Sequence, residues 1–219
     1  MESAVTWTVN LTQLLAALSN AMDCVEGEIA GVSLHHAKRV ACLCAVLGEE
    51  LGLDRESLFD LTACALLHDN ALPEYIATEY RPESGVALGA HCVYGEENMR
   101  RFPLFGDVAG ALLYHHENAD GTGPFGKRAA EVPLYARLIH LADILDVTFD
   151  FKANTVGAGQ VEAFLHAQRG ALFDRESVDL LLTYNDIGRL SERLRDGRLE
   201  TTMRESLPQI RRSLTPAQV

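Results

Sequence analysis

The chain has 219 residues, a formal net charge of −12 at pH 7 and a pI of about 5.0. Its hydrophobic fraction of 47% and charged fraction of 23% are ordinary for a globular protein with a buried core. The acidic balance argues against broad nucleic-acid binding through phosphate contacts. It would also repel a phosphate-bearing substrate, unless bound cations reverse the local field.

Neither membrane insertion nor a disulfide framework is indicated. No apolar run is long enough to span a bilayer, and the first residues lack the basic and apolar regions of a signal peptide. The five cysteines are odd in number and form no CxxC pair, which favours buried thiols in a reducing compartment. We therefore predict a cytoplasmic protein with no membrane contact.

The N-terminal part of the chain has the apolar spacing of helices. Leucines between Leu11 and Met22 recur at helical intervals and predict a first helix. A second helix is expected from Ser33, as N-cap, to Leu51, with Gly52 at its C-terminal end. Both helices present a continuous apolar face, so we expect them to pack on one core.

Further helices are expected towards the middle of the chain. A third helix begins after an N-cap at Asp54 and runs towards His68. A loop is expected around Pro73 and Pro82, followed by a helix over about 91–102.

The second half of the chain continues the helical pattern. A helix is expected over about 107–116, and a glycine-rich loop follows it. Pro133 is suited to the first position of the next helix, which continues through Asp143 and Asp146. A second loop is expected at 156–160, and the segments after it also have helical spacing.

Strands of convincing alternation, internal repeats and low-complexity tracts are not evident in the sequence. We therefore predict an all-α fold with one domain over residues 1–185. Residues 186–219 are expected to form a helical extension packed on or trailing that domain. The arginines of this extension are interspersed with acids, which is typical of a solvated helical face. A homodimer contact or a signalling partner on these helices is the alternative.

Histidines and acids recur at the faces and ends of the expected helices. The candidates are His36, His68, Asp69, His91, His115, His116 and Asp143. A single histidine on an apolar face is more often a hydrogen-bonded core residue than a ligand. Burying this many ionisable groups without compensation would cost several kcal/mol for each one, as an order of magnitude. Divalent cations remove that cost, because neutral imidazoles and ionised carboxylates are then ligands.

In order along the chain, these motifs resemble the HD superfamily of metal-dependent phosphohydrolases, and within it the HD-GYP branch. The resemblance covers roughly residues 10–185. HAKRV is similar to the HxxRV of the branch, and ALLHDN contains its HD pair. HCVYG resembles HPxxG, HHENADGTG matches HHExxDGxG, and LADILD resembles ADxxDA.

The resemblance implies an all-α helical bundle with a two-metal centre in its core. One metal would be held by His36, His68, Asp69 and Asp143. Asp69 would bridge to a second metal held by His91 and His115, with His116 also in the ligand set. A bridging hydroxide would be the nucleophile, His68 and Asp69 would be the catalytic pair, and Lys152, Gly121 and Gly123 would contact the substrate. Iron or manganese is favoured, with magnesium, nickel and zinc as alternatives.

The sequence departs from the branch where substrate phosphate is contacted. Ala71 and Leu72 replace the glycine and lysine of HDxGK, and Gly-Pro-Phe at 123–125 replaces Gly-Tyr-Pro. Val32 replaces the glutamate of trimetal members, which favours a dimetal site. Only Lys152 matches the arginine that follows the last aspartate, and Thr155 replaces a further lysine.

Three functions follow as hypotheses. The first is a metal-dependent phosphohydrolase, acting as a phosphodiesterase on cyclic di-GMP or another phosphate ester. The second is a catalytically inactive signalling or binding module that keeps the metal site, since phosphate-binding residues are depleted. The third is an oxygen-using di-iron enzyme, because imidazole and carboxylate ligands suit iron as well.

Overall fold

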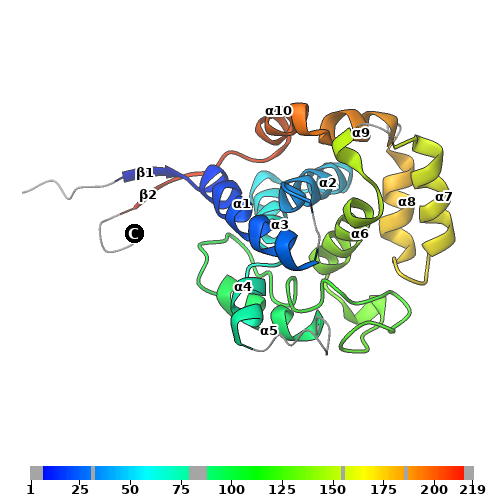
Figure 1. The fold of residues 1–219 in the computed structure, drawn as a ribbon, viewed down its shortest axis with the longest axis horizontal. Coiled ribbons are helices and arrows are strands. Elements are labelled where there is room, and N and C mark those ends of the chain that lie inside the picture. Colours follow the sequence, from blue (N-terminus) through cyan, green and yellow to red (C-terminus); the bar gives the residue numbers. More distant parts are fainter. Residues whose placement is uncertain (1–6, 31–32, 79–87, 154–155, 185–186, 215–219) are drawn as a thin grey trace, which may run out of the picture.

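The computed structural model describes residues 7–30, 33–78, 88–153, 156–184 and 187–214. Within these residues the chain is a bundle of helices with one small two-stranded sheet, shown in Figure 1. The predicted all-α fold is confirmed. No described helix is long and apolar enough to cross a membrane. Val32, Pro82 and Thr155, which entered the sequence argument, lie outside the described residues.

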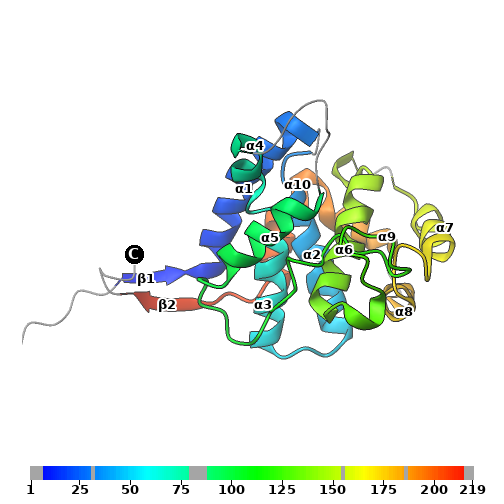
Figure 2. The same cartoon turned by 90° about the horizontal axis from the view of Figure 1, so that it is seen from below.

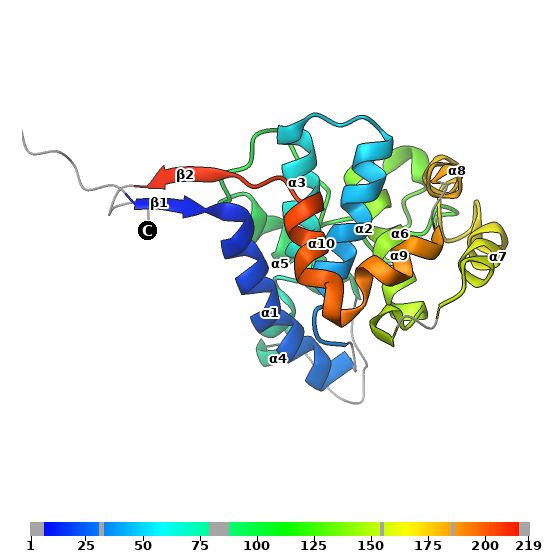
Figure 3. The ribbon, with the colours of Figure 1, turned by 90° about the horizontal axis from the view of Figure 1, so that it is seen from above.

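Helix α2 (His36–Glu50) forms the centre of the bundle and is buried along most of its length. It packs against α3 (Arg55–Leu66) and α6 (Leu134–Thr148). Helices α1 (Leu11–Ala30) and α10 (Asp196–Ser206) cover its other sides, as Figure 3 shows. Apolar residues of α2, α3 and α6 join in one hydrophobic core, among them Val40, Leu43, Leu47, Leu61, Leu66, Leu138 and Leu141.

The remaining helices flank this centre. Helices α4 (Leu72–Thr78) and α5 (Leu88–Met99) contact each other, and α4 also contacts α1, as Figure 2 shows. Helices α7 (Ala158–Gln168) and α8 (Arg175–Thr183) lie side by side on the opposite flank. Short 3₁₀ turns, η2 (Ala129–Glu131) and η3 (Phe151–Ala153), precede and follow α6.

The two ends of the described chain meet in an antiparallel pair of strands. β1 (Trp7–Asn10) pairs with β2 (Arg211–Leu214), with Trp7 opposite Leu214 and Asn10 opposite Arg211. All views show this pair extending away from the helical body. The sequence indicated no strand here, because four residues are too few to display a period-two pattern.

The C-terminal helices join the main core. The predicted extension over 186–219 contains α9 (Ile187–Leu194) and α10, and their buried apolar residues belong to the same hydrophobic cluster as α2. Lys38 on α2 reaches Glu200 on α10, with 2.5 Å between Nζ and Oε1. Within the described residues, these helices are therefore a packed layer over α2.

Several helix ends differ from the prediction. The N-cap at Asp54 is confirmed, since its Oδ1 accepts the backbone N–H of Ser57 at 2.8 Å. Helix α2, however, begins at His36 after an N-cap at His35 with a φ of 67°. Ser33 forms the preceding turn instead. The loop expected around Pro73 is helix α4, because proline is tolerated in the first turn of a helix.

The helix predicted over 107–116 is wrong. Residues 109–116 form successive turns instead of a regular helix. Gly110 has a φ of 82°, which interrupts right-handed helical geometry. The carboxylate of Glu96 on α5 accepts the N–H groups of Gly110, Leu112 and Leu113 at 2.7, 3.3 and 3.2 Å, and thereby fixes the turns.

Candidate metal centre

The predicted ligands come from five segments that meet below α2. His36 is the first residue of α2, and His68 and Asp69 lie in the turn that follows α3. His91 lies on α5, Asp143 on α6, and His115 and His116 end the turns at 109–116. The structure brings all seven side chains into one contiguous cluster, with the contacts described below. Their role as ligands is a prediction from the sequence.

One part of the cluster lies between α2, α6 and the end of α3. His36 Nε2 is 3.2 Å from Asp143 Oδ1, and His68 Nε2 is 3.0 Å from Asp69 Oδ2. The rings of His36 and His68 meet edge to face, with their centroids 5.3 Å apart. Donor atoms of His36, His68 and Asp69 all lie within 4.8 Å of one another, which suits a single cation.

The other part of the cluster lies between α5 and the turns at 109–116. Asp69 Oδ1 is 3.1 Å from His91 Nε2 and 3.5 Å from His115 Nε2. His116 Nε2 is 3.2 Å from His91 Nε2, and its Nδ1 is 3.8 Å from Asp143 Oδ2. Asp69 therefore offers one oxygen to each part of the cluster, which is the arrangement expected of a bridging carboxylate.

Buried polar atoms in the cluster lack ordinary partners. His36, His68 and His115 are at most 1% exposed. Their Nε2 atoms and Asp69 Oδ1 have no well-formed hydrogen bond among the described residues. Such atoms are costly to bury unless something else satisfies them. Imidazole nitrogens and carboxylate oxygens are ligands for divalent cations, so the residues present fit a metal centre.

The electrostatics of the cluster favour the protonation states that bind cations. Burial lowers the pKa of His115 and, with the charge of His115 added, holds the pKa of His116 well below its ordinary value. Burial alone would raise the pKa of Asp69, but the surrounding histidines hold it well below its usual range. These two imidazoles are therefore neutral and the carboxylate is ionised at neutral pH.

Two other histidines of the cluster, His36 and His68, behave differently. Burial opposes protonation of His36, yet the adjacent carboxylates of Asp143 and Asp146 raise its pKa well above the ordinary value. Burial likewise opposes protonation of His68, but the charge of Asp69 raises its pKa to about 9. The carboxylates therefore attract positive charge to this part of the cluster.

Side chains behind the predicted ligands orient one of them, His36. Asp146 Oδ2 lies 2.7 Å from His36 Nδ1, so the opposite ring nitrogen faces Asp143. Arg39 donates to the same carboxylate from Nε at 2.7 Å and from Nη2 at 3.0 Å. Arg39 is 1% exposed, so this is a buried ion pair. Asp146 therefore orients His36.

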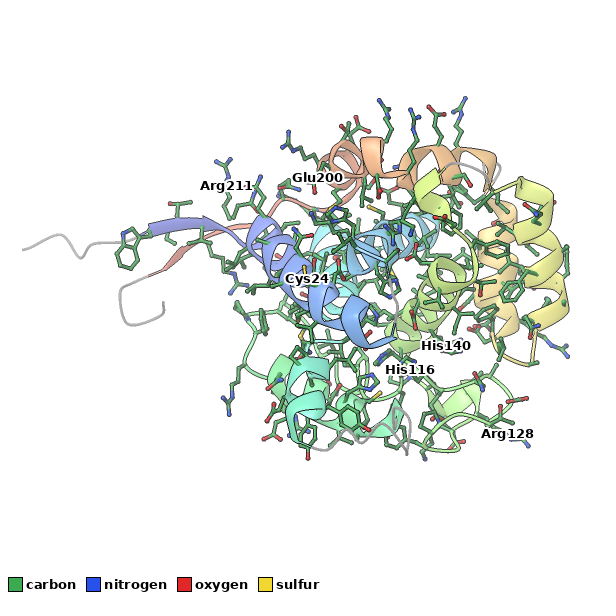
Figure 4. All side chains as sticks on the ribbon, viewed as in Figure 1. Cys24, His116, Arg128, His140, Glu200 and Arg211 are labelled. Atoms are coloured by element: carbon green, nitrogen blue, oxygen red, sulfur yellow. The ribbon has the colours of Figure 1, made fainter. Side chains whose placement is uncertain are left out.

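Backbone carbonyls fix two other rings of the cluster. His68 Nδ1 is 2.9 Å from the carbonyl of Ala65, and His115 Nδ1 is 2.6 Å from that of Leu112. His140 Nδ1 in turn lies 2.9 Å from the carbonyl of His115. Figure 4 shows His140 and His116 close together below α6. A hydrogen bond at Nδ1 leaves Nε2 as the atom available to a cation.

Glu117 and Asp120 hold the glycine loop that follows the double histidine. Glu117 accepts the N–H groups of Phe125 and Lys127 at 2.6 and 2.5 Å, and Asp120 accepts that of Thr122 at 3.0 Å. A Cβ on Gly123 would lie 2.6 Å from Glu117 Cα, so only glycine fits there. Figure 4 shows Arg128 on the outer part of this loop.

The predicted substrate contacts lie outside the ligand cluster. Lys152 on η3 is partly exposed and lines a cavity of about 300 Å³ with His36, Arg39 and Asp146. Gly121 adopts a φ of 86° in the loop, and a Cβ there would crowd Arg128. Both glycines thus have structural reasons for their identity. The roles of Lys152, Gly121 and Gly123 toward substrate stay predictions.

Sequence reasoning missed Arg39, His140 and Cys92. Arg39 lies within the HAKRV motif, three residues beyond His36, and that spacing on one helix face was the available signal. His140 precedes Asp143 by three residues; it is buried, and its Nδ1 lies against the carbonyl of His115. Cys92 follows His91 directly, and nothing in the sequence distinguished it from the other buried thiols.

The helical bundle and its histidine–aspartate cluster define a class of protein. The family model for the HD domain matches residues 28–176, so the chain belongs to the HD domain family. The superfamily recognised from the motifs is thereby confirmed.

Particular relatives share this domain. The chain is 32% identical over 162 residues to the cyclic di-GMP phosphodiesterase response regulator RpfG of Xanthomonas campestris pv. campestris, covering 66% of this chain and 41% of the relative. It is 32% identical over 123 residues to 3'3'-cGAMP-specific phosphodiesterase 3 of Vibrio cholerae, covering 51% and 26%. The chain thus spans less than half the length of these curated relatives.

Solved structures show the same fold. A cyclic GMP-AMP specific phosphodiesterase of V. cholerae, V-cGAP3, aligns with a TM-score of 0.72 at 19% identity, covering 97% of this chain and 57% of that one. An HDG"Y"P protein of Bdellovibrio bacteriovorus aligns with a TM-score of 0.53 at 20% identity, covering 78% and 60%. At these identities the likeness concerns the fold alone.

Proposed function

We propose that this chain is a metal-dependent phosphodiesterase that hydrolyses a cyclic dinucleotide or a related phosphate diester. The observation that carries the proposal is the convergence of seven ligand-type side chains around Asp69, whose oxygens face two groups of buried histidines. The relatives named above support the substrate class, since their names specify cyclic di-GMP and cGAMP.

The seven predicted ligands divide between two proposed cation positions. His36, His68, Asp69 and Asp143 would hold the first, and His91, His115, His116 and Asp69 the second. Iron or manganese suits these imidazole and carboxylate donors, with magnesium, nickel and zinc as alternatives. Bound divalent ions would lower the pKa of a water for attack on phosphorus and neutralise charge on the phosphoryl oxygens.

The side chains of this chain have two tasks in that reaction. Asp69 and Asp143 would supply the negative charge that retains cations in the core. The carboxylate of Asp146 and the backbone carbonyls of Ala65 and Leu112 fix histidine rings through their Nδ1 atoms. Lys152 provides a partly exposed cation beside His36, where it would bind a phosphate oxygen. Positive charge at this place matters because the chain as a whole carries −12.

A second candidate is a binding module that keeps the centre without turnover. Leu72, at the position of the branch's lysine, is only 9% exposed at the start of α4, so no cation projects from that position. Each lost charge-assisted phosphate contact removes roughly 1.5–3 kcal/mol of interaction. An oxygen-using di-iron enzyme is the third candidate, since the donor set also suits iron.

Turnover measured on defined metal loads separates these candidates. The full chain, loaded in turn with Mn(II), Fe(II), Ni(II) or Zn(II), is assayed for hydrolysis of cyclic di-GMP, cGAMP and bis(p-nitrophenyl) phosphate. We expect hydrolysis that the Asp69→Asn variant loses. Metal-loaded protein that binds a cyclic dinucleotide without cleaving any of the three diesters would favour the binding module. Oxygen consumption by the iron-loaded protein would favour the third candidate.

A further inference from the structure

Cys92 is a buried thiol beside the second group of histidines that the proposed function does not use. It lies on α5 directly after His91 and is 0% exposed. Its Sγ is 3.7 Å from His91 Nε2 and 3.7 Å from His115 Nδ1. In the motif HCVYG it occupies the place of the proline in the HPxxG that this motif resembles.

The atoms around His91 Nε2 are spaced like ligands of one cation. Asp69 Oδ1 lies 3.1 Å from this nitrogen, His116 Nε2 lies 3.2 Å from it, and Cys92 Sγ lies 3.7 Å from it. Zinc-type bonds of about 2.0–2.3 Å in a tetrahedral arrangement separate neighbouring ligand atoms by about 3.3–3.7 Å. The sulfur thus lies at ligand distance from a nitrogen that already faces a carboxylate and a second imidazole.

Two further observations point to a cation at this place. Donor atoms of His91, Cys92, His115 and His116 lie within 4.8 Å of one another. His115 is 0% exposed, and its Nε2 faces Asp69 with no well-formed hydrogen bond among the described residues. An unsatisfied nitrogen on a fully buried ring, facing the same carboxylate, is suited to bind a cation.

We propose that Cys92 Sγ is a thiolate ligand at the second cation position, beside His91, His116 and Asp69. The inference rests on the proposed metal-dependent function and makes that position chemically different from the first. A thiolate favours Zn(II), Co(II) and Fe(II) over Mg(II) and Mn(II), whereas the first position has only nitrogen and oxygen donors. The thiol proton is released to solvent as the cation binds, and no change of oxidation state is involved.

Cobalt binding to the full chain tests the assignment. Co(II) is titrated into metal-free protein, Cys92→Ala, Cys92→Ser and the control Cys42→Ala, which removes a buried thiol on α2 instead. We expect a near-ultraviolet sulfur-to-cobalt charge-transfer band in the wild type and control that both Cys92 variants lack. Zn(II) affinity should fall at least about tenfold in Cys92→Ala, with Mn(II) affinity nearly unchanged.

X-ray absorption of the zinc-loaded wild type gives a second measurement that needs no variant. A sulfur scatterer in the first coordination sphere supports the proposal. Cobalt or zinc that binds with only nitrogen and oxygen neighbours overturns the role of Cys92 and leaves the phosphodiesterase proposal standing. A wild-type chain that binds none of these metals overturns both.

Discussion

Asp146 holds His36 from the side opposite the candidate metal centre, with 2.7 Å between Asp146 Oδ2 and His36 Nδ1. Arg39 donates hydrogen bonds to the same carboxylate, so Asp146 links the candidate ligand His36 to a buried guanidinium group. Because the Asp146 carboxylate is fixed by Arg39 and in turn contacts the His36 ring, the direction of His36 Nε2 depends on the Asp146–Arg39 pair.

We expect Asp146→Asn to lower the affinity for the cation held by His36 by about 10–100-fold, because a neutral amide orients the imidazole less well. Isothermal titration with Mn(II) or Zn(II) measures the change. Asp179→Asn is the matched control, since Asp179 pairs only with the exposed Arg169. An affinity equal to the wild type would mean that Asp146 is a structural partner of Arg39 alone.

Metal stoichiometry follows from the division of the cluster. Asp69→Ala removes the carboxylate between both histidine groups and should abolish binding of both ions, whereas His91→Ala should lose one. Elemental analysis of the purified variants counts the ions. His166→Ala, an exposed histidine on α7, should bind as many as the wild type. Equal metal content in all three variants would place the metals elsewhere.

Lys152 tests the predicted phosphate contact. Lys152→Ala should weaken cyclic dinucleotide binding by about 10–100-fold, the effect of one charge-assisted hydrogen bond, while metal content stays constant. Equilibrium binding measures the loss. Lys127→Ala, which removes a cation paired with Glu131 on the loop, is the comparison. If the two variants bind equally well, the cavity beside His36 is not the phosphate site.

Gly123→Ala should distort the loop that follows the double histidine. Its new Cβ would lie 2.6 Å from Glu117 Cα and 2.8 Å from the backbone nitrogen of Asn118, which cannot move aside independently. We expect a loss of about 1–3 kcal/mol in the free energy of unfolding, measured by urea denaturation. Gly159→Ala on α7, where a Cβ meets nothing within 4 Å, should be neutral or stabilising by up to about 1 kcal/mol.

Asp60→Asn should loosen the segment that leads to the turns at 109–116. The buried carboxylate of Asp60 accepts the N–H groups of Phe105 and Gly106 at 3.0 and 2.7 Å. An amide is neutral and replaces one of the two accepting oxygens by an NH2 donor. The free energy of unfolding should fall by about 1–3 kcal/mol. Asp107→Asn serves as the control, because exposed Asp107 caps only Ala109. Equal stability of the two variants would assign Asp60 no anchoring role.

The helices and the positions of the candidate ligands were predictable from local patterns. Apolar periodicity marked α1, α2, α3 and α6, and the Asp54 N-cap was placed correctly because its signal is local. The HD pair and the double histidine were identified because they occur in a recognisable order along the chain. The resemblance carried by this order therefore predicted which side chains would meet.

The failures arose where distant residues determine the local conformation. The 109–116 segment has helical composition, but Glu96 on α5 satisfies its N–H groups and Gly110 turns the chain. Helix α2 starts at His36, and the hydroxyl of Ser33 accepts a hydrogen bond from Arg39 Nη2 at 2.5 Å instead of capping the helix. His140 and Cys92 entered the site through contacts that no local pattern encodes.

Asp69 couples cation binding at the two groups of histidines, because its carboxylate faces both. One of its oxygens faces His68, and the other faces His91 and His115. A cation that binds one oxygen of this carboxylate also fixes the rotamer and the charge that a cation at the other oxygen would meet. Occupancy should therefore be cooperative, and the factor by which the first ion alters the affinity for the second must be the same in whichever order they bind.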